Sequence, residues 1–146
     1  MSKREYDHKY RSCSRTYATL LIFHETMKPQ EITAALELEP FDTARRGDRA
    51  ILGRKVPKNL WARGTYDQYE SRDVRFHVDK ILDTLRGKED RLHFLLKRGC
   101  EIEISCFWES AAGNGGPILD SGFLQRLTRF PVLLSFDIWL EFAVKD

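Results

Sequence analysis

Residues 100–109 read CEIEISCFWE, and this stretch decides the class of fold. Its even-numbered residues are all apolar, whereas its odd-numbered residues include three glutamates and a serine. Successive side chains of a β-strand point to opposite faces of the sheet, so this alternation is typical of a half-buried strand. The stretch therefore predicts a strand with one face in the core and one largely acidic face outside it.

Two other runs predict strands that frame this one. Residues 17–24, YATLLIFH, are nearly continuously apolar, which suits a central strand. Residues 132–142, VLLSFDIWLEF, alternate again and predict a last strand with one wet face. Shorter strands are expected at three places, residues 50–52, 60–62 and 118–119.

Helical spacing appears between these strands. Lys28-Pro29 opens the first predicted helix and Pro40 ends it, because proline suits the first turn of a helix and interrupts its interior. Apolar residues recur at helical spacing over 74–85 and 92–96, and a third segment, 123–127, follows a capping Asp120 or Ser121. We therefore expect an α+β fold, a mostly antiparallel sheet with helices on one face, on a ferredoxin-like or doubled strand-helix-strand plan.

The composition is that of a folded globular protein. The chain has 146 residues, of which 42% are hydrophobic and 32% are charged, with a net charge of only +2. Residues 1–15 are basic and lack periodicity, so we expect a flexible basic arm followed by a single α+β domain over residues 16–146.

The cysteines and the lack of long apolar runs indicate the compartment. No stretch approaches the roughly 18 apolar residues of a membrane span, and the first residues lack the apolar centre of a secretory signal. Cys100 and Cys106 lie six steps apart on one predicted strand, roughly 20 Å, too far for a disulfide. Three cysteines also leave one unpaired, so we expect reduced thiols, a cytoplasmic location and no membrane association.

The order of several landmarks resembles an uncharacterised, mainly bacterial family, domain of unknown function 4279. They are Leu36-x-Leu38-x-Pro40, Gly47-Asp48, Trp61, the leucine-rich helical middle and Ser135-Phe136-Asp137-Ile138-Trp139. The resemblance implies a shared fold and transfers no catalytic residues, because the family has no settled activity. The longer basic arm and the very basic middle segment depart from it.

The wet face of the two alternating strands is the first candidate binding surface. It would carry Glu103, Ser105, Phe107, Asp137 and Trp139. Large aromatic side chains outside the core often mark contact sites. For Asp137 the alternative is a structural contact to a backbone amide or to an arginine such as Arg63.

A basic segment between residues 45 and 63 is the second candidate. Only Asp48 opposes its seven cations, which are Arg45, Arg46, Arg49, Arg54, Lys55, Lys58 and Arg63. The segment could contact phosphates together with the basic arm. Alternatively, its charges solvate a hairpin or pair with the acidic sheet face at Glu101, Glu103 and Glu141.

Catalytic and metal-binding patterns are not evident in the sequence. The four histidines, His8, His24, His77 and His93, have no ligand spacing, although His77 and His93 could meet in space. We expect isolated surface histidines, no metal site, no cofactor and no catalytic residues, while an enzymatic activity stays open.

The leading functional hypothesis is an intracellular binding module, protein-binding with an immunity-like or regulatory role, that uses the open sheet face. The alternatives are nucleic-acid binding through the basic segment and small-molecule binding in a groove of the sheet face. A homodimer that hides the open face is a further option.

Overall fold

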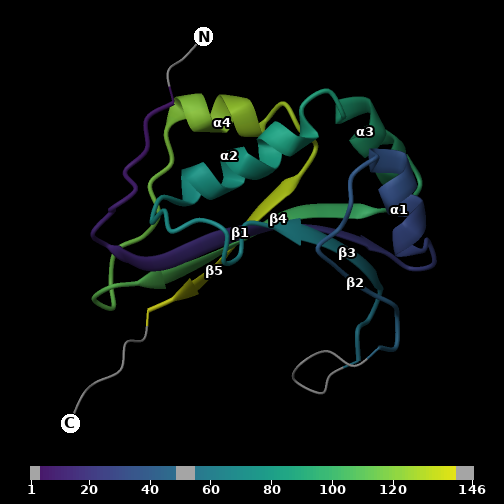
Figure 1. The fold of residues 1–146 in the computed structure, drawn as a ribbon, viewed down its shortest axis with the longest axis horizontal. Helices are drawn as coiled ribbons and strands as arrows, with labels where there is room; N and C mark the ends of the chain where they lie inside the picture. Colours follow the sequence, from purple (N-terminus) through teal and green to yellow (C-terminus); the bar gives the residue numbers. More distant parts are fainter. Residues whose placement is uncertain (1–3, 49–54, 141–146) are drawn as a thin grey trace.

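The structure is a computed structural model that describes residues 4–48 and 55–140 (Figure 1). The described residues form five strands, namely β1 (Cys13–His24), β2 (Asp42–Ala44), β3 (Asn59–Gly64), β4 (Glu101–Ser110) and β5 (Leu133–Trp139). They also form four helices, namely α1 (Pro29–Leu36), α2 (Val74–Leu85), α3 (Glu89–Lys97) and α4 (Ser121–Leu127).

The strands form one sheet in the order β2-β3-β1-β4-β5. Neighbouring strands are antiparallel except β4 and β5, which are parallel. A parallel connection needs a crossover, and α4 supplies it. The α+β fold with a mostly antiparallel sheet is therefore confirmed. Along the chain from β1 to β4, helices follow β1 and β3. This succession is compatible with the doubled strand-helix-strand plan.

All four helices lie on one side of the sheet (Figure 1). The core lies between them and the sheet, and its largest buried side chains are Trp61, Trp108 and Phe123. In β4 the buried positions are the even-numbered ones predicted from the sequence, from Ile102 to Trp108. The odd-numbered positions lie on the opposite face, which no described helix covers.

The helix starts follow the capping signals in the sequence. The Asp73 carboxylate accepts the Arg75 N–H at α2, and Asp120 accepts the N–H groups of Gly122 and Phe123 at α4. Such side-chain caps satisfy amide groups that have no partner within the helix. The first helix, α1, ends at Leu36, earlier than Pro40 had suggested, and Glu37 follows it in the left-handed region with φ 52°.

Several local predictions need correction. The first strand begins at Cys13 rather than Tyr17. Ile118 and Leu119 form no strand, because β1 and β5 already occupy both sides of β4. The three-residue strand β2 was not predicted, since so short a segment shows no periodicity.

Two further predictions concern residues 50–52 and the division of the chain at residue 15. Residues 50–52, a predicted strand, lie outside the described residues. The division at residue 15 into an arm and a domain stays a prediction, although β1 already begins before it. Within the described ranges, no helix is long and apolar enough to cross a membrane.

Candidate binding face on the open side of the sheet

The five residues predicted for the sheet-face site lie side by side on β4 and β5. The parallel register pairs Ser105 with Ser135, Phe107 with Asp137 and Glu109 with Trp139. Paired residues point to the same side, so the odd-numbered side chains of both strands share the face opposite the helices. The structure thus brings Glu103, Ser105, Phe107, Asp137 and Trp139 together on the open face.

A row of aromatic rings crosses this face. Trp139 on β5 contacts Phe107 on β4, with ring centroids 6.2 Å apart. Phe107 stacks on Tyr17 of β1 at 4.9 Å and 15°, and Tyr17 meets the edge of Tyr66 at 5.0 Å. We call these four residues, Tyr66, Tyr17, Phe107 and Trp139, the aromatic row. Its two ends are open to solvent, since Tyr66 is 56% exposed and Trp139 52%.

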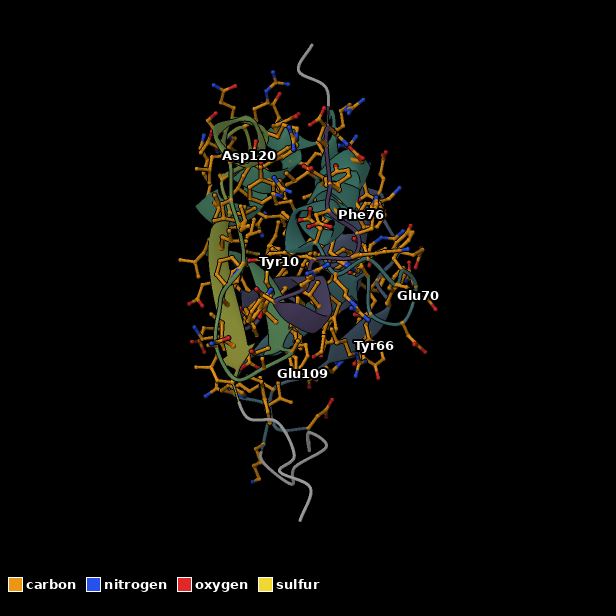
Figure 2. The ribbon with its side chains drawn as sticks, turned by 90° about the vertical axis from the view of Figure 1, so that its left-hand side faces the viewer. Tyr10, Tyr66, Glu70, Phe76, Glu109 and Asp120 are labelled. Atoms are coloured by element: carbon orange, nitrogen blue, oxygen red, sulfur yellow. The ribbon has the colours of Figure 1, made fainter. Side chains whose placement is uncertain are left out.

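The row ends in a cation beside a surface hollow. The Arg15 guanidinium lies 5.5 Å from the centre of the Tyr17 ring and 5.1 Å from that of Tyr66. Arg15, Tyr17 and Arg72 help to line a hollow of about 450 Å³ at this end of the sheet. Figure 2 views the molecule from this end of the sheet and labels Tyr66 and Glu70 on it. Burial raises the pKa of the Tyr17 hydroxyl, so Tyr17 stays uncharged near neutral pH.

Carboxylates flank the row on β4 and β5. Asp137 accepts the indole N–H of Trp139 at 3.1 Å, and Glu103 accepts the Ser135 hydroxyl at 2.6 Å. The suggested pairing of Asp137 with Arg63 is wrong, because Arg63 instead donates to the Glu39 carbonyl. Asp137 therefore helps to hold Trp139 in place on an exposed surface.

Sequence reasoning missed Tyr17, Tyr66 and Arg15 as members of this surface. The alternation of residues 17–23 contained a signal for Tyr17, since it shares its parity with the less buried positions of β1. Tyr66 lies in the turn after β3, where no periodicity indicates a direction. Its contact with Tyr17 depends on how β3 pairs with β1.

The basic segment is neutralised in part by the domain itself, since two of its five described cations pair with carboxylates. Lys58 pairs with Glu101 at 2.6 Å and with Glu25 at 3.7 Å, and Arg46 lies 3.5 Å from Glu25. The predicted alternative of pairing with the acidic face is thus seen at Glu101, whereas Glu103 binds Ser135. The other five residues of the candidate set differ from these two. Arg45 and Lys55 are exposed, Arg63 packs over the Phe41 ring, and Arg49 and Arg54 lie outside the described residues.

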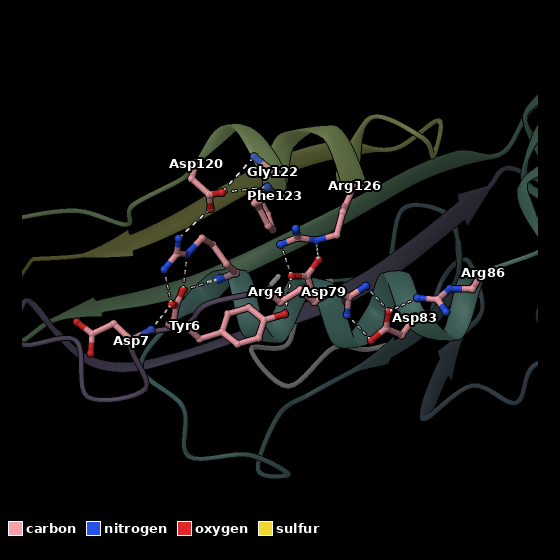
Figure 3. A network of polar contacts seen from close by, with 12 residues as sticks. Arg4, Tyr6, Asp7, Asp79, Asp83, Arg86, Asp120, Gly122, Phe123 and Arg126 are labelled. Atoms are coloured by element: carbon pink, nitrogen blue, oxygen red, sulfur yellow. Dashed lines mark hydrogen bonds and ion pairs between the residues drawn. The ribbon is translucent and has the colours of Figure 1, made fainter. Parts of the chain in front are cut away.

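A second polar cluster lies far from the open face, where residues 4–7 run along α2 (Figure 3). Arg4 donates two bonds of 2.9 Å to Asp83, and the Asp7 N–H donates to Asp73. The Tyr6 hydroxyl donates to Asp79, a carboxylate that is only 1% exposed. The pKa of Tyr6 is raised to about 12, mainly by burial and secondly by this hydrogen bond.

Arginines from α2 and α4 complete this cluster. Arg126 binds Asp79 through Nε at 3.0 Å and Nη2 at 2.8 Å. Arg75 joins Asp73 to Asp120 at 2.7 and 2.8 Å. Each arginine of the cluster therefore meets a carboxylate, and the arrangement holds the N-terminal segment, α2 and α4 together.

His77 and the three cysteines are buried. His77 is fully buried, which corrects the expectation of a surface histidine. Its two ring nitrogens face the Thr65 hydroxyl and the Ser71 carbonyl, both at 2.7 Å, rather than His93. Burial raises the pKa of the three buried thiols to about 11 for Cys13 and Cys100 and about 12 for Cys106. Among residues 4–48 and 55–140, no three His, Cys, Asp or Glu side chains are grouped so that they could hold a metal ion.

Fold and face together define an α+β domain with helices on one side of its sheet and an aromatic surface on the other. The family model described as Domain of unknown function (DUF4279) matches residues 14–141, which cover most of the chain. The chain therefore belongs to this family, as the landmark residues indicated. No curated protein and no solved structure matches the chain.

Proposed function

We propose that this domain is a protein-binding module whose contact surface is the aromatic row. The observation that carries the proposal is the contact of four aromatic rings, from three strands and one turn, on the face opposite the helices. Tyrosine, tryptophan and arginine are the residue types that supply most of the binding energy at protein interfaces. Arg15 at one end adds the third of these types.

The row is ordered before any partner arrives. Phe107 and Tyr17 stack on neighbouring strands, and Asp137 holds the indole of Trp139. Side chains that are already held lose little conformational freedom on binding, so more of the contact energy appears as affinity. An ordered aromatic surface is therefore well suited to recognition without chemistry, as immunity-like and regulatory domains require.

Charge indicates the kind of partner. Glu103, Glu109 and Asp137 lie on the same face as the row, and phosphates would be repelled there. A protein surface with an apolar centre and lysine or arginine at its edge complements this face. The neutralisation of Arg46 and Lys58 by Glu25 and Glu101 also favours a protein over a nucleic acid.

A pull-down from lysate of the source cells, at two salt concentrations, tests the proposal. Wild-type protein is compared with Phe107→Ala and with Phe94→Ala, a matched control at an aromatic that is 49% exposed on α3. Circular dichroism verifies that both variants fold. We expect one discrete protein to be recovered by wild type and Phe94→Ala and lost by Phe107→Ala.

The location of the contact is then measured with the recovered partner. Hydrogen exchange of the complex should show added protection in β1, β4 and β5 on the strands that carry the row. Equal recovery by both variants, or recovery of salt-sensitive nucleic acid alone, would contradict the proposal.

A further inference from the structure

The two edges of the sheet differ in length and in chemistry. The β2 edge has three residues and includes an exposed Asp42. The β5 edge has seven residues, and among the described strands none pairs with its outer side. Proteins usually protect such an edge with lysine, proline or a bulge, because its free backbone groups can pair with another chain.

Within the described strand β5, from Leu133 to Trp139, there is no lysine, proline or bulge. Leu133 is 61% exposed, Ile138 44%, Trp139 52% and the following Leu140 48%. Within β5, Asp137 is the one charged residue. A strand that pairs with this edge must therefore be largely apolar itself.

The sequence of this edge is symmetric in polarity about Phe136. Reading outwards, polar Ser135 and Asp137 flank Phe136, and apolar residues follow on each side as far as Val132 and Leu140. A two-fold interface places each residue opposite its mirror position on the other copy. An antiparallel pair of β5 strands centred on Phe136 therefore matches apolar with apolar and polar with polar at every position.

Charge distinguishes this register from its neighbours. Centred on Phe136, the pairing places Asp137 opposite Ser135, which can donate a hydrogen bond. Centred on Asp137, it would place two carboxylates directly opposite each other, which is destabilising. Centred on Ser135, it would place Asp137 opposite Leu133. Of these three registers, only the one centred on Phe136 places every residue opposite one of like polarity.

We propose that two copies of this protein form a two-fold dimer by antiparallel pairing of their β5 strands, centred on Phe136. The two five-stranded sheets join into one, and Leu133 of each copy packs against Trp139 of the other. Opposite residues of an antiparallel pair point to the same side, so both open faces lie on one side of the joined sheet. The dimer shares Trp139 with the aromatic row but does not depend on the proposed function, because the strand pairing uses the β5 edge and leaves Phe107 free.

Sedimentation equilibrium of the full chain over a concentration series tests the dimer. Wild type is compared with Ile138→Lys, which places a charge opposite Leu134 twice in each dimer, and with Ile118→Lys, the same change at a loop residue that is 54% exposed. We expect twice the mass of one chain for wild type and Ile118→Lys, and a dimer weakened tenfold or more for Ile138→Lys. A wild type that stays monomeric, or equal dimerisation of all three proteins, overturns the proposal.

Cross-linking tests the register. In the double variant Leu133→Cys, Trp139→Cys the new thiols face each other between copies, while within one chain they lie about 20 Å apart, beyond the reach of a disulfide. The native Cys13, Cys100 and Cys106 are buried and should not interfere. Mild oxidation should give a covalent dimer of the double variant and not of either single variant. No covalent dimer, or equal dimer from the single variants, overturns the register.

Discussion

Replacing Asp79 with asparagine tests whether the polar cluster on α2 contributes to stability. Asp79 is 1% exposed and accepts three hydrogen bonds, one from the Tyr6 hydroxyl and two from the Arg126 guanidinium. Asparagine keeps the size of the side chain and removes its charge. The change therefore leaves packing in place and takes the anion away from Arg126.

The expected cost follows from the burial of the two partners. Breaking a buried ion pair on one side costs about 3–5 kcal/mol, because an uncompensated charge is left inside the protein. The Arg126 side chain is 19% exposed and keeps part of its hydration, so the cost should lie at or somewhat below the lower limit of this range. We expect Asp79→Asn to lower the free energy of unfolding by about 2–3 kcal/mol.

Urea unfolding followed by tryptophan fluorescence measures this loss, and a double-mutant cycle with Tyr6→Phe assigns it. Tyr6→Phe alone removes one hydrogen bond to a carboxylate, at a cost of about 1–2 kcal/mol. Because both changes weaken the same contact, their combined cost should fall short of the sum by at least about 0.5 kcal/mol. A loss below about 1 kcal/mol for Asp79→Asn, or strict additivity, would refute the reasoning.

Two further predictions concern single positions, one in β3 and one in α2. Gly64→Ala should destabilise the protein by about 1–3 kcal/mol, because a Cβ at this position would lie 2.6 Å from the Ala18 carbonyl oxygen. Gly116→Ala serves as the control in the same urea assay, because a Cβ at position 116 would meet no other part of the protein within 4 Å. Burial lowers the pKa of His77 below its ordinary 6.5, so the unfolded chain binds a proton first and stability falls as pH decreases from about 6.5. His77→Gln should flatten this pH dependence between about pH 7 and 5, and unchanged slopes in the two proteins would argue against it.

Most of what the sequence could predict about the fold came from the alternation of apolar and polar residues between even and odd positions. The alternation in residues 100–109 predicted the buried face of β4, and the alternation in residues 132–142 predicted the existence of β5. The parallel pairing of β4 with β5 was not predictable in the same way, since it depends on where the α4 crossover places the chain. The missed β2 strand is held by pairing with β3 rather than by its own pattern.

The same limit applies to the polar contacts and the aromatic row. Parity placed Phe107 and Asp137 on the outer faces of their strands, and the register of β4 with β5 brought those faces together. The bond from Arg4 to Asp83 joins residues 79 positions apart, so no local spacing could indicate it. Contacts of this kind depend on tertiary packing, so the local pattern of residues 4–15 could not indicate them.

Trp139 belongs both to the open face and to the β5 edge. Experiments that separate the two proposals must therefore change other residues. In the dimer, Leu133 of the other copy packs against Trp139, so the row that remains for a partner consists of Tyr66, Tyr17 and Phe107. A change at Trp139 would therefore weaken both interactions at once. Phe107 stacks on Tyr17 on the open face, whereas Ile138, with the opposite parity on β5, lies on the other face of the sheet. Loss of partner binding in Phe107→Ala with an intact dimer, together with loss of the dimer in Ile138→Lys, assigns one role to the face and the other to the edge.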